Sequence, residues 1–139
     1  MIDGTVLWLV VAAVIIAAVL FIIMRFMPYS ANIDKEKYQS RWLEIEHGLN
    51  PGSRDSQYMA ILKADKLLDQ VLRETGSRGQ TMGERMKSRQ NAWSNANAVW
   101  AAHKIRNQIA HDENVQLSET TVRRALASFK QALKDLGAM

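Results

Sequence analysis

The sequence predicts an all-α protein in which a single transmembrane helix precedes a bundle of helices. Three observations carry this prediction. Thr5 to Met24 form an uninterrupted apolar run of 20 residues. Beyond that run, apolar residues recur three and four positions apart, as in amphipathic helices. Helix caps and breakers punctuate the chain, with almost no strand signal. At 139 residues the chain has room for one modest domain besides the membrane segment.

The apolar run has the length of a membrane span. At about 1.5 Å per residue it covers about 30 Å, the thickness of the hydrocarbon core of a bilayer. Trp8 and Tyr29 lie near its two ends, where interfacial aromatic residues are expected. We predict an N-terminal tail over 1–4, a transmembrane helix over 5–27, a linker over 28–33 that begins at the helix breaker Pro28, and a helical bundle over 34–139.

Two other interpretations of this run fit the sequence less well. A cleaved signal peptide has a shorter apolar core, a basic residue where this chain has Asp3, and a clearer cleavage site than Tyr29–Ala31 offers. A pilin-like N-terminus resembles this one, but such pilins carry an early glutamate within the apolar helix, which is absent here. An uncleaved single-span anchor is therefore favoured.

Charged residues next to the run predict its orientation. Asp3 is the charged side chain before it, whereas basic residues follow it at Arg25, Lys35, Lys37 and Arg41. The positive-inside rule then places the N-terminus outside the cell membrane and residues 26–139 in the cytoplasm. The chain has no cysteine, which excludes disulfides and cysteine-based metal sites and is compatible with a cytosolic domain.

The bundle is expected to begin with two long helices. Between Asp34 and His47, aromatic and aliphatic residues recur at helical spacing, and Gly48 with Asn50–Ser53 then breaks the pattern. The next helix is predicted from Asp55 to Thr75, with Gly76 as its C-cap. Its apolar stripe consists of Met59, Ile61, Leu62, Leu68, Val71 and Leu72.

Three further helices follow. Thr81 and Glu84 have the spacing of a capping box and predict a short helix, and 88–94 is expected to be a polar loop. Ser94 or Asn95 caps a helix that runs to Ala110 or His111. Ser118 is expected to cap the last helix, which Gly137 ends. Its inward residues are Val122, Leu126, Phe129, Leu133 and Leu136.

The segment Arg106–His111 contains the residues best suited to chemistry. An arginine holds phosphate with a two-pronged guanidinium, and a histidine transfers protons near neutral pH. His103, Asn107 and His111 are spaced four apart and share one helix face. We interpret His103 as a packed or hydrogen-bonded helix residue. No third ligand accompanies His103 and His111, so no metal site is expected. The sequence contains no phosphate-binding glycine motif, so it does not support nucleotide hydrolysis, and no cofactor is expected.

Arg106-Asn107 followed by His111 resembles the signature of HEPN-like domains. Val99–Ile105 before the motif, Asp112 after it and the Ala64–Asp69 segment are similar to these domains as well, so the resemblance covers roughly residues 55–139. It implies a four-helix bundle that forms a homodimer and, in active members, cleaves RNA without a metal ion. Arg106 would then hold phosphate, Asn107 would orient substrate or histidine, and His111 would be the acid–base group, supplied twice by the dimer.

Each of these residues also has a structural interpretation. Arg106 can form a buried ion pair with Asp65 or Asp69 on the neighbouring helix. His111 can stabilise the C-terminus of its helix through the helix dipole, and Asn107 can be an ordinary surface residue. The motif therefore predicts either a phosphate site or a packing contact.

The basic excess of the chain is local. The net charge is +4, and Arg78, Arg85, Lys87 and Arg89 lie in one short stretch opposed by Glu84. Such a patch attracts RNA phosphates or anionic lipid headgroups, or forms a solvated helix face. With Arg85, Lys87 and Arg89 as substrate-binding candidates, the first functional hypothesis is a membrane-anchored ribonuclease or RNA-binding protein. The second is a non-catalytic membrane-tethered adaptor that binds a protein partner or a nucleotide-like ligand.

Overall fold

The computed structural model describes residues 3–26 and 32–139, which form six α-helices, one short 3₁₀ helix and no strand. The all-helical prediction is confirmed for these residues. The predictions that concern Pro28, Tyr29 and Ala31 lie outside the described part of the chain. The chain divides into two units, residues 1–30 and 31–139.

The first unit contains one helix, α1 (Gly4–Phe26). Its side chains from Asp3 to Met24 are exposed, and the mean hydropathy over Gly4–Met24 is 3.3. In hydrocarbon a helix satisfies every backbone N–H and C=O within one segment, which makes it the favoured state for such a run. Helix α1 is long and apolar enough to cross a membrane, and an N-terminal signal sequence shares these two properties.

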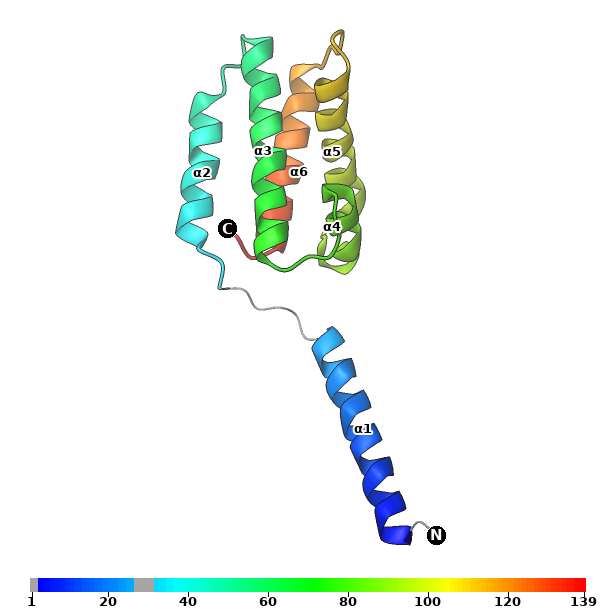
Figure 1. The fold of residues 1–139 in the computed structure, drawn as a ribbon. Coiled ribbons are helices and arrows are strands. Elements are labelled where there is room, and N and C mark those ends of the chain that lie inside the picture. Colours follow the sequence, from blue (N-terminus) through cyan, green and yellow to red (C-terminus); the bar gives the residue numbers. More distant parts are fainter. Residues whose placement is uncertain (1–2, 27–31) are drawn as a thin grey trace. The chain divides into compact units, whose positions relative to one another are not determined.

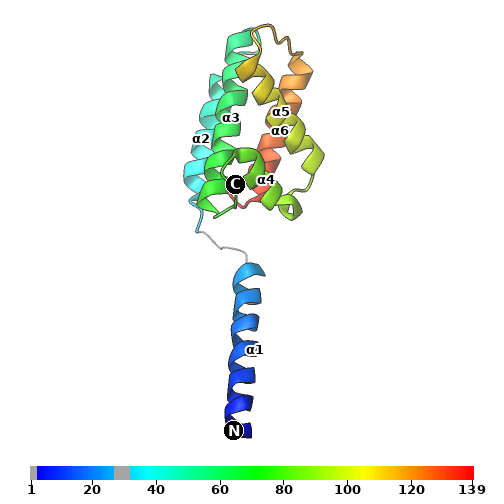
Figure 2. The same cartoon turned by 45° about the vertical axis from the view of Figure 1, so that its right-hand side comes forward.

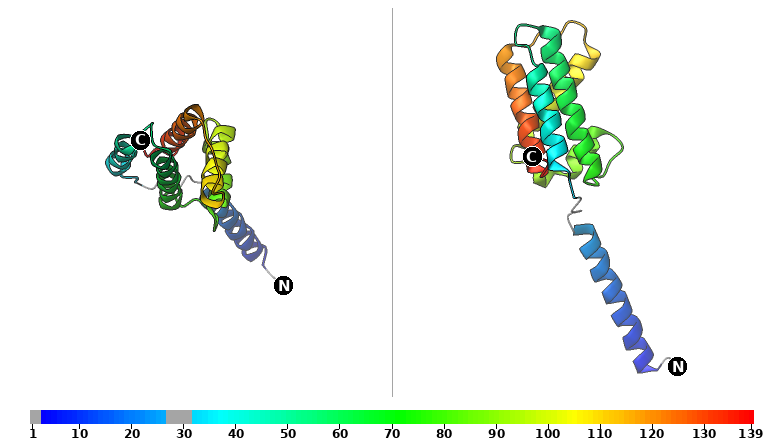
Figure 3. Two further views of the ribbon diagram at one scale, coloured as in Figure 1. Left: turned by 90° about the horizontal axis from the view of Figure 1, so that it is seen from above. Right: turned by 90° about the vertical axis from the view of Figure 1, so that its left-hand side faces the viewer.

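The second unit is an antiparallel bundle of four long helices with a short one at its side. The long helices are α2 (Lys35–Gly48), α3 (Arg54–Glu74), α5 (Ala96–His111) and α6 (Glu119–Asp135), which run side by side in Figure 1. The short helix α4 (Met82–Ser88) lies at the end where α3 finishes and α5 begins (Figure 2). Helix α3 packs against the other four α-helices of the unit and separates α2 from α5 (Figure 3).

The helix starts follow the capping residues of the sequence. Thr81 and Glu84 form the predicted capping box, in which Thr81 Oγ1 accepts a hydrogen bond of 3.1 Å from the Glu84 N–H. Asn95 caps α5 and Ser118 caps α6, each accepting from the amide three residues later. Each cap satisfies an N–H that the helix leaves unpaired. Within the predicted loop over 88–94 the structure adds a 3₁₀ helix, Gln90–Ala92.

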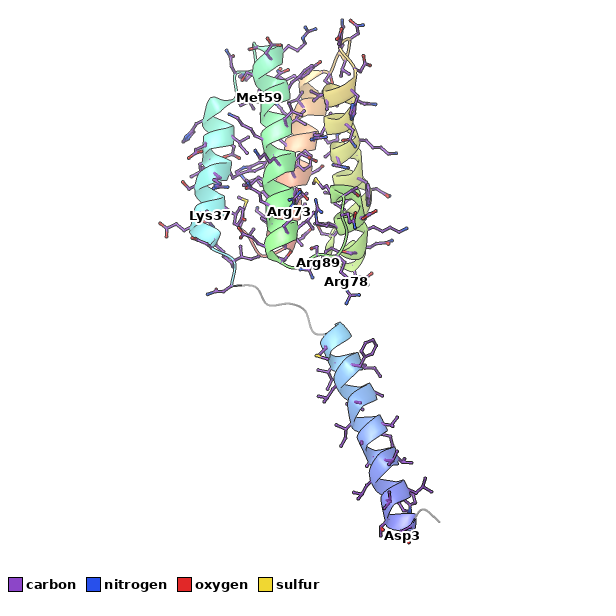
Figure 4. The ribbon with its side chains drawn as sticks, viewed as in Figure 1. Asp3, Lys37, Met59, Arg73, Arg78 and Arg89 are labelled. Carbon is purple, nitrogen blue, oxygen red and sulfur yellow. The ribbon has the colours of Figure 1, made fainter. Side chains whose placement is uncertain are left out.

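The core of the bundle lies entirely within residues 33–139, so this unit has the means to fold without α1. Its largest fully buried side chains include Tyr38, Ile61, Leu68, Met86 and Phe129. The prediction that Met59 belongs to the buried stripe is wrong, because this side chain is 50% exposed (Figure 4). Two residues correspond to about 200° around a helix, so Met59 and the buried Ile61 point in nearly opposite directions.

Candidate functional site

A polar cavity opens between α3, α4 and α5. It has a volume of about 800 Å³ and is lined by side chains from all three helices and from the turn before α4. We call it the polar hollow. Its charged and amide-bearing lining residues are Asp65, Lys66, Asp69, Arg73, Gln80, Arg85, His103, Arg106 and Asn107.

The spacing of residues on α3 explains why two carboxylates face this cavity. Leu62, Asp65, Asp69 and Arg73 follow one another at intervals of three or four, which places them on one side of the helix. Asp65 is only 3% exposed, and Asp69 is partly buried. A buried carboxylate requires a charged or hydrogen-bonding partner, and α4 and α5 supply such partners for both.

Four side chains close a ring of polar contacts between α3 and α5. Asp65 Oδ1 lies 2.8 Å from His103 Nδ1, and Asp65 Oδ2 lies 3.2 Å from Arg106 Nε. Arg106 Nη1 donates to Asn107 Oδ1 at 3.1 Å, and Asn107 Nδ2 lies 3.5 Å from His103 Nε2. We call these residues the Asp65 ring. Its weakest links are the contact of 3.5 Å and the Arg106 Nε–H, which is buried near Oδ2 without a well-directed hydrogen bond.

The ring determines where the protons of His103 lie. A carboxylate only accepts hydrogen bonds, so His103 Nδ1 carries the proton that Asp65 receives. A guanidinium only donates, so the Asn107 oxygen faces Arg106 and the amide NH₂ faces His103. In this tautomer His103 Nε2 accepts from the Asn107 amide across the contact of 3.5 Å.

A second ion pair attaches α4 to α3. Arg85 Nε donates to Asp69 Oδ1 at 2.8 Å, and Arg85 Nη2 donates to Asp69 Oδ2 at 3.0 Å. The remaining Arg85 nitrogen, Nη1, donates to the Gly79 carbonyl at 3.1 Å. Gly79 has φ +132°, and a Cβ there would lie 2.5 Å from the Glu84 Cβ, so only glycine allows this approach of the turn. Arg73 also donates to Asp69 from the exposed side.

Positive charge exceeds negative charge in the lining of the polar hollow. Asp65 and Asp69 face the guanidinium groups of Arg73, Arg85 and Arg106. The exposed ammonium group of Lys66 adds a fourth cation. Lys66, Arg73 and the partly exposed Arg106 keep donors at the rim of the cavity. This arrangement favours an anionic ligand over a cationic one.

The structure brings together Arg106, Asn107 and Asp65 from the predicted site. Of the two carboxylates considered as partners for Arg106, Asp65 contacts it, and Asp69 pairs with Arg85 and Arg73 instead. His111 is the exposed last residue of α5 and takes no part in the Asp65 ring. The motif arginine and the motif histidine are thus not brought into one cluster within this chain.

The basic patch also divides between different roles. Arg85 is buried, and all three of its guanidinium nitrogens bind Asp69 or Gly79. Arg89 donates to the Ser77 hydroxyl and to a backbone carbonyl of the turn after α3. Lys87 is exposed, as is Arg78 at the same end of the bundle (Figure 4). Of the three substrate-binding candidates, only Lys87 is exposed, whereas Arg89 is partly buried.

His103 is the residue of this site that sequence patterns alone indicate least clearly. The prediction of a hydrogen-bonded helix residue agrees with its contacts. Its position in the lining of the polar hollow also makes it a candidate for proton transfer. The available signal is its spacing of four from Asn107, together with the acidic residues on the preceding long helix. Among the described residues, no group of three or more histidine and carboxylate side chains is arranged to hold a metal ion.

Comparison with known proteins gives no further guide to the site. No family model matches the chain, and it matches neither a curated protein nor a solved structure.

Proposed function

We propose that this protein is a membrane-anchored, HEPN-like helical domain that binds RNA through the polar hollow and cleaves it without a metal ion. The observation that carries this proposal is the excess of arginine and lysine around a cavity that also contains a histidine. RNA supplies a phosphate at every nucleotide, and guanidinium groups match the geometry of phosphate oxygens.

The chemistry of RNA cleavage fits the same group of residues. A base removes the proton of a ribose 2′-hydroxyl, whose oxygen then attacks the adjacent phosphorus. A cation at the phosphate stabilises the negative charge that develops. Arg106 is placed for the second role, because its side chain is 37% exposed and lines the cavity. On the HEPN resemblance, a homodimer would bring two such sites together.

The membrane part of the proposal rests on α1 and its flanking charges. Arg25 lies in the last turn of this helix, Lys35 and Lys37 follow it, and Asp3 precedes it. An uncleaved anchor of this polarity holds residues 26–139 on the cytoplasmic side, where RNA is present. If α1 were instead a cleaved signal sequence, the bundle would be exported away from cellular RNA.

A second function, a non-catalytic adaptor at the membrane, is favoured by the Asp65 ring. Arg106 is engaged there by Asp65 and Asn107, and His111 is outside the ring. An arginine held in this way can serve to fix α5 against α3. The adaptor would present the bundle to a protein partner. This second hypothesis predicts that the protein does not bind RNA.

An RNA-binding titration separates the two functions. Residues 32–139 are titrated onto a fluorescent single-stranded RNA in EDTA, and anisotropy is measured over a range of salt concentrations. The variant Lys66→Ala/Arg73→Ala removes two exposed rim cations from the hollow. For single strands, each phosphate that the protein no longer neutralises reduces the slope of log K against log salt by about 0.7, so we expect a decrease of about 1.4 for this variant.

The matched control is Arg124→Ala/Lys134→Ala on α6, which removes two exposed cations away from the hollow. We expect this control to keep the wild-type slope. Absence of RNA binding, or equal slopes for the two double variants, would reject the proposed site and favour the adaptor. Cleavage is followed on a gel in the same EDTA buffer.

A further inference from the structure

We infer that the acid–base group of this site is His103, oriented by Asp65, and that the motif histidine His111 is dispensable for the reaction. This inference rests on the proposed RNA function and concerns the same cavity. It assigns His103 as a catalytic residue and Asp65 as a positioning residue.

His103 is held in the orientation that a general base requires. Its Nδ1–H points at Asp65 Oδ1, 2.8 Å away, so in the neutral tautomer the lone pair is on Nε2. The imidazole side chain is 12% exposed, and the Trp100 indole lies edge-on to it with ring centroids 6.2 Å apart. Burial between α3 and Trp100 restricts its rotation, so Nε2 keeps one direction.

The Nε2 atom is the loosely held end of this histidine. Its partner in the Asp65 ring is Asn107 Nδ2 at 3.5 Å, the upper limit of a hydrogen bond. A ribose hydroxyl that replaces this amide therefore displaces only a weak contact. Asn107 is also linked to Arg106, so the position next to Nε2 lies beside a phosphate-binding guanidinium.

His111 has none of these properties. It ends α5 and is exposed, and among the described residues it has no hydrogen-bond partner that would fix its tautomer. His103 and His111 are eight residues apart on one helix, about 12 Å along its axis. One phosphate in the polar hollow therefore has His103 and Arg106 beside it, whereas His111 is two helical turns away from His103.

The step that follows is a transesterification. The 2′-hydroxyl proton passes to His103 Nε2, the 2′-oxygen forms a bond to phosphorus, and the bond from phosphorus to the 5′-oxygen breaks. The leaving 5′-oxygen takes a proton from water, and the protonated His103 returns its proton to the hydroxide so formed. The products are a 2′,3′-cyclic phosphate and a 5′-hydroxyl. Asp65 stabilises the transient imidazolium, and Arg106 stabilises the charge on the phosphate oxygens.

The test compares His103→Gln with His111→Gln, the matched change at the motif histidine. Residues 32–139 are assayed in EDTA with a labelled single-stranded RNA, and binding, cleavage rate and end-group chemistry are measured for each variant. We expect His103→Gln to cleave at least about 100-fold more slowly while it binds within about twofold of wild type. His111→Gln should cleave as wild type does.

Two further variants separate catalysis from packing. His103→Ala leaves space for free imidazole, which should restore part of the cleavage, an effect that a purely structural histidine would not show. Asp65→Asn keeps an oxygen for the His103 Nδ1–H but removes the charge. It should lower the cleavage rate of bound RNA, whereas binding should be at least as tight as in wild type, because the change removes a negative charge beside Arg106. The fold of each variant is checked by circular dichroism.

The outcomes that overturn the inference are distinct from those that overturn the proposed function. Wild-type protein that does not bind RNA rejects both. Wild-type protein that binds RNA without cutting it rejects the catalytic role of His103 and leaves RNA binding intact. Cleavage that survives His103→Gln but is abolished in His111→Gln also rejects the inference. So does unfolding of both His103 variants, because His103 would then serve the structure.

Discussion

Replacing Arg85 by methionine tests whether the buried ion pair with Asp69 holds α4 in place. The change keeps most of the aliphatic volume and removes the guanidinium group. It deletes three charge-assisted hydrogen bonds of 2.8 to 3.1 Å, two to Asp69 and one to Gly79. The Asp69 carboxylate then stays partly buried with Arg73, itself 66% exposed, as its remaining cation.

The expected loss of stability is large for a single substitution. Removing one member of a buried ion pair destabilises a protein by about 3–5 kcal/mol. Because Arg73 still neutralises part of the Asp69 charge, we expect a value at the lower end, about 3 kcal/mol. For a domain of this size that corresponds to a decrease in Tm of roughly 12–24 °C, at about 4–8 °C for each kcal/mol.

The matched control is Lys37→Met, which also replaces a cation by methionine. Lys37 pairs with Glu74 at 3.0 Å, but both side chains are about 40% exposed. Water screens such a pair, so the expected loss is below about 1 kcal/mol. Urea unfolding of residues 32–139, followed by circular dichroism, measures both variants. If Arg85→Met loses no more stability than Lys37→Met, burial of the pair does not determine its strength and our reasoning is wrong.

Two further predictions concern pH and the membrane. Hydrogen bonds from Lys130 (2.8 Å) and Trp42 (2.6 Å) lower the pKa of Glu46. The ionised Glu46 carboxylate therefore stabilises the fold fully above its unfolded pKa, and this contribution is lost as pH falls through its lower folded pKa. In Glu46→Gln the urea midpoint should therefore depend less steeply on pH between roughly pH 5 and pH 3 than in wild type. The effect should be small because Glu46 is exposed, and the same pH dependence in both proteins would contradict the prediction. Val11→Arg/Ile15→Arg raises the free energy of inserting α1 into a membrane by about 5–7 kcal/mol, which offsets the favourable contribution of its aliphatic residues. The variant should therefore be absent from the carbonate-washed membrane fraction that contains the wild-type protein. Retention of the double variant in that fraction would contradict the assignment of α1 as the membrane anchor. A wild-type chain shortened by cleavage after α1 would indicate a signal sequence.

The helices and their ends could be predicted from the sequence because they depend on nearby residues. The capping box joins Thr81 and Glu84, which are three positions apart, and the side chains of Asn95 and Ser118 accept hydrogen bonds from backbone amides three residues later. The apolar run of α1 is equally local. Met59 shows the limit of this reasoning. An apolar residue within a predicted stripe is buried only if a neighbouring helix covers its side of α3, and Met59 remains half exposed.

The chain by itself determined that these segments are helices and that Arg106 and Asn107 are adjacent on one of them. Only the tertiary structure decided which side chains meet across helices. His103 lies 38 positions from Asp65 in the sequence, and Arg85 lies 16 from Asp69. Such pairs depend on the rotation and crossing of whole helices, which the packing of the shared core determines and no local pattern encodes. For the same reason the motif His111 lies in solvent, whereas His103 lies on a buried carboxylate.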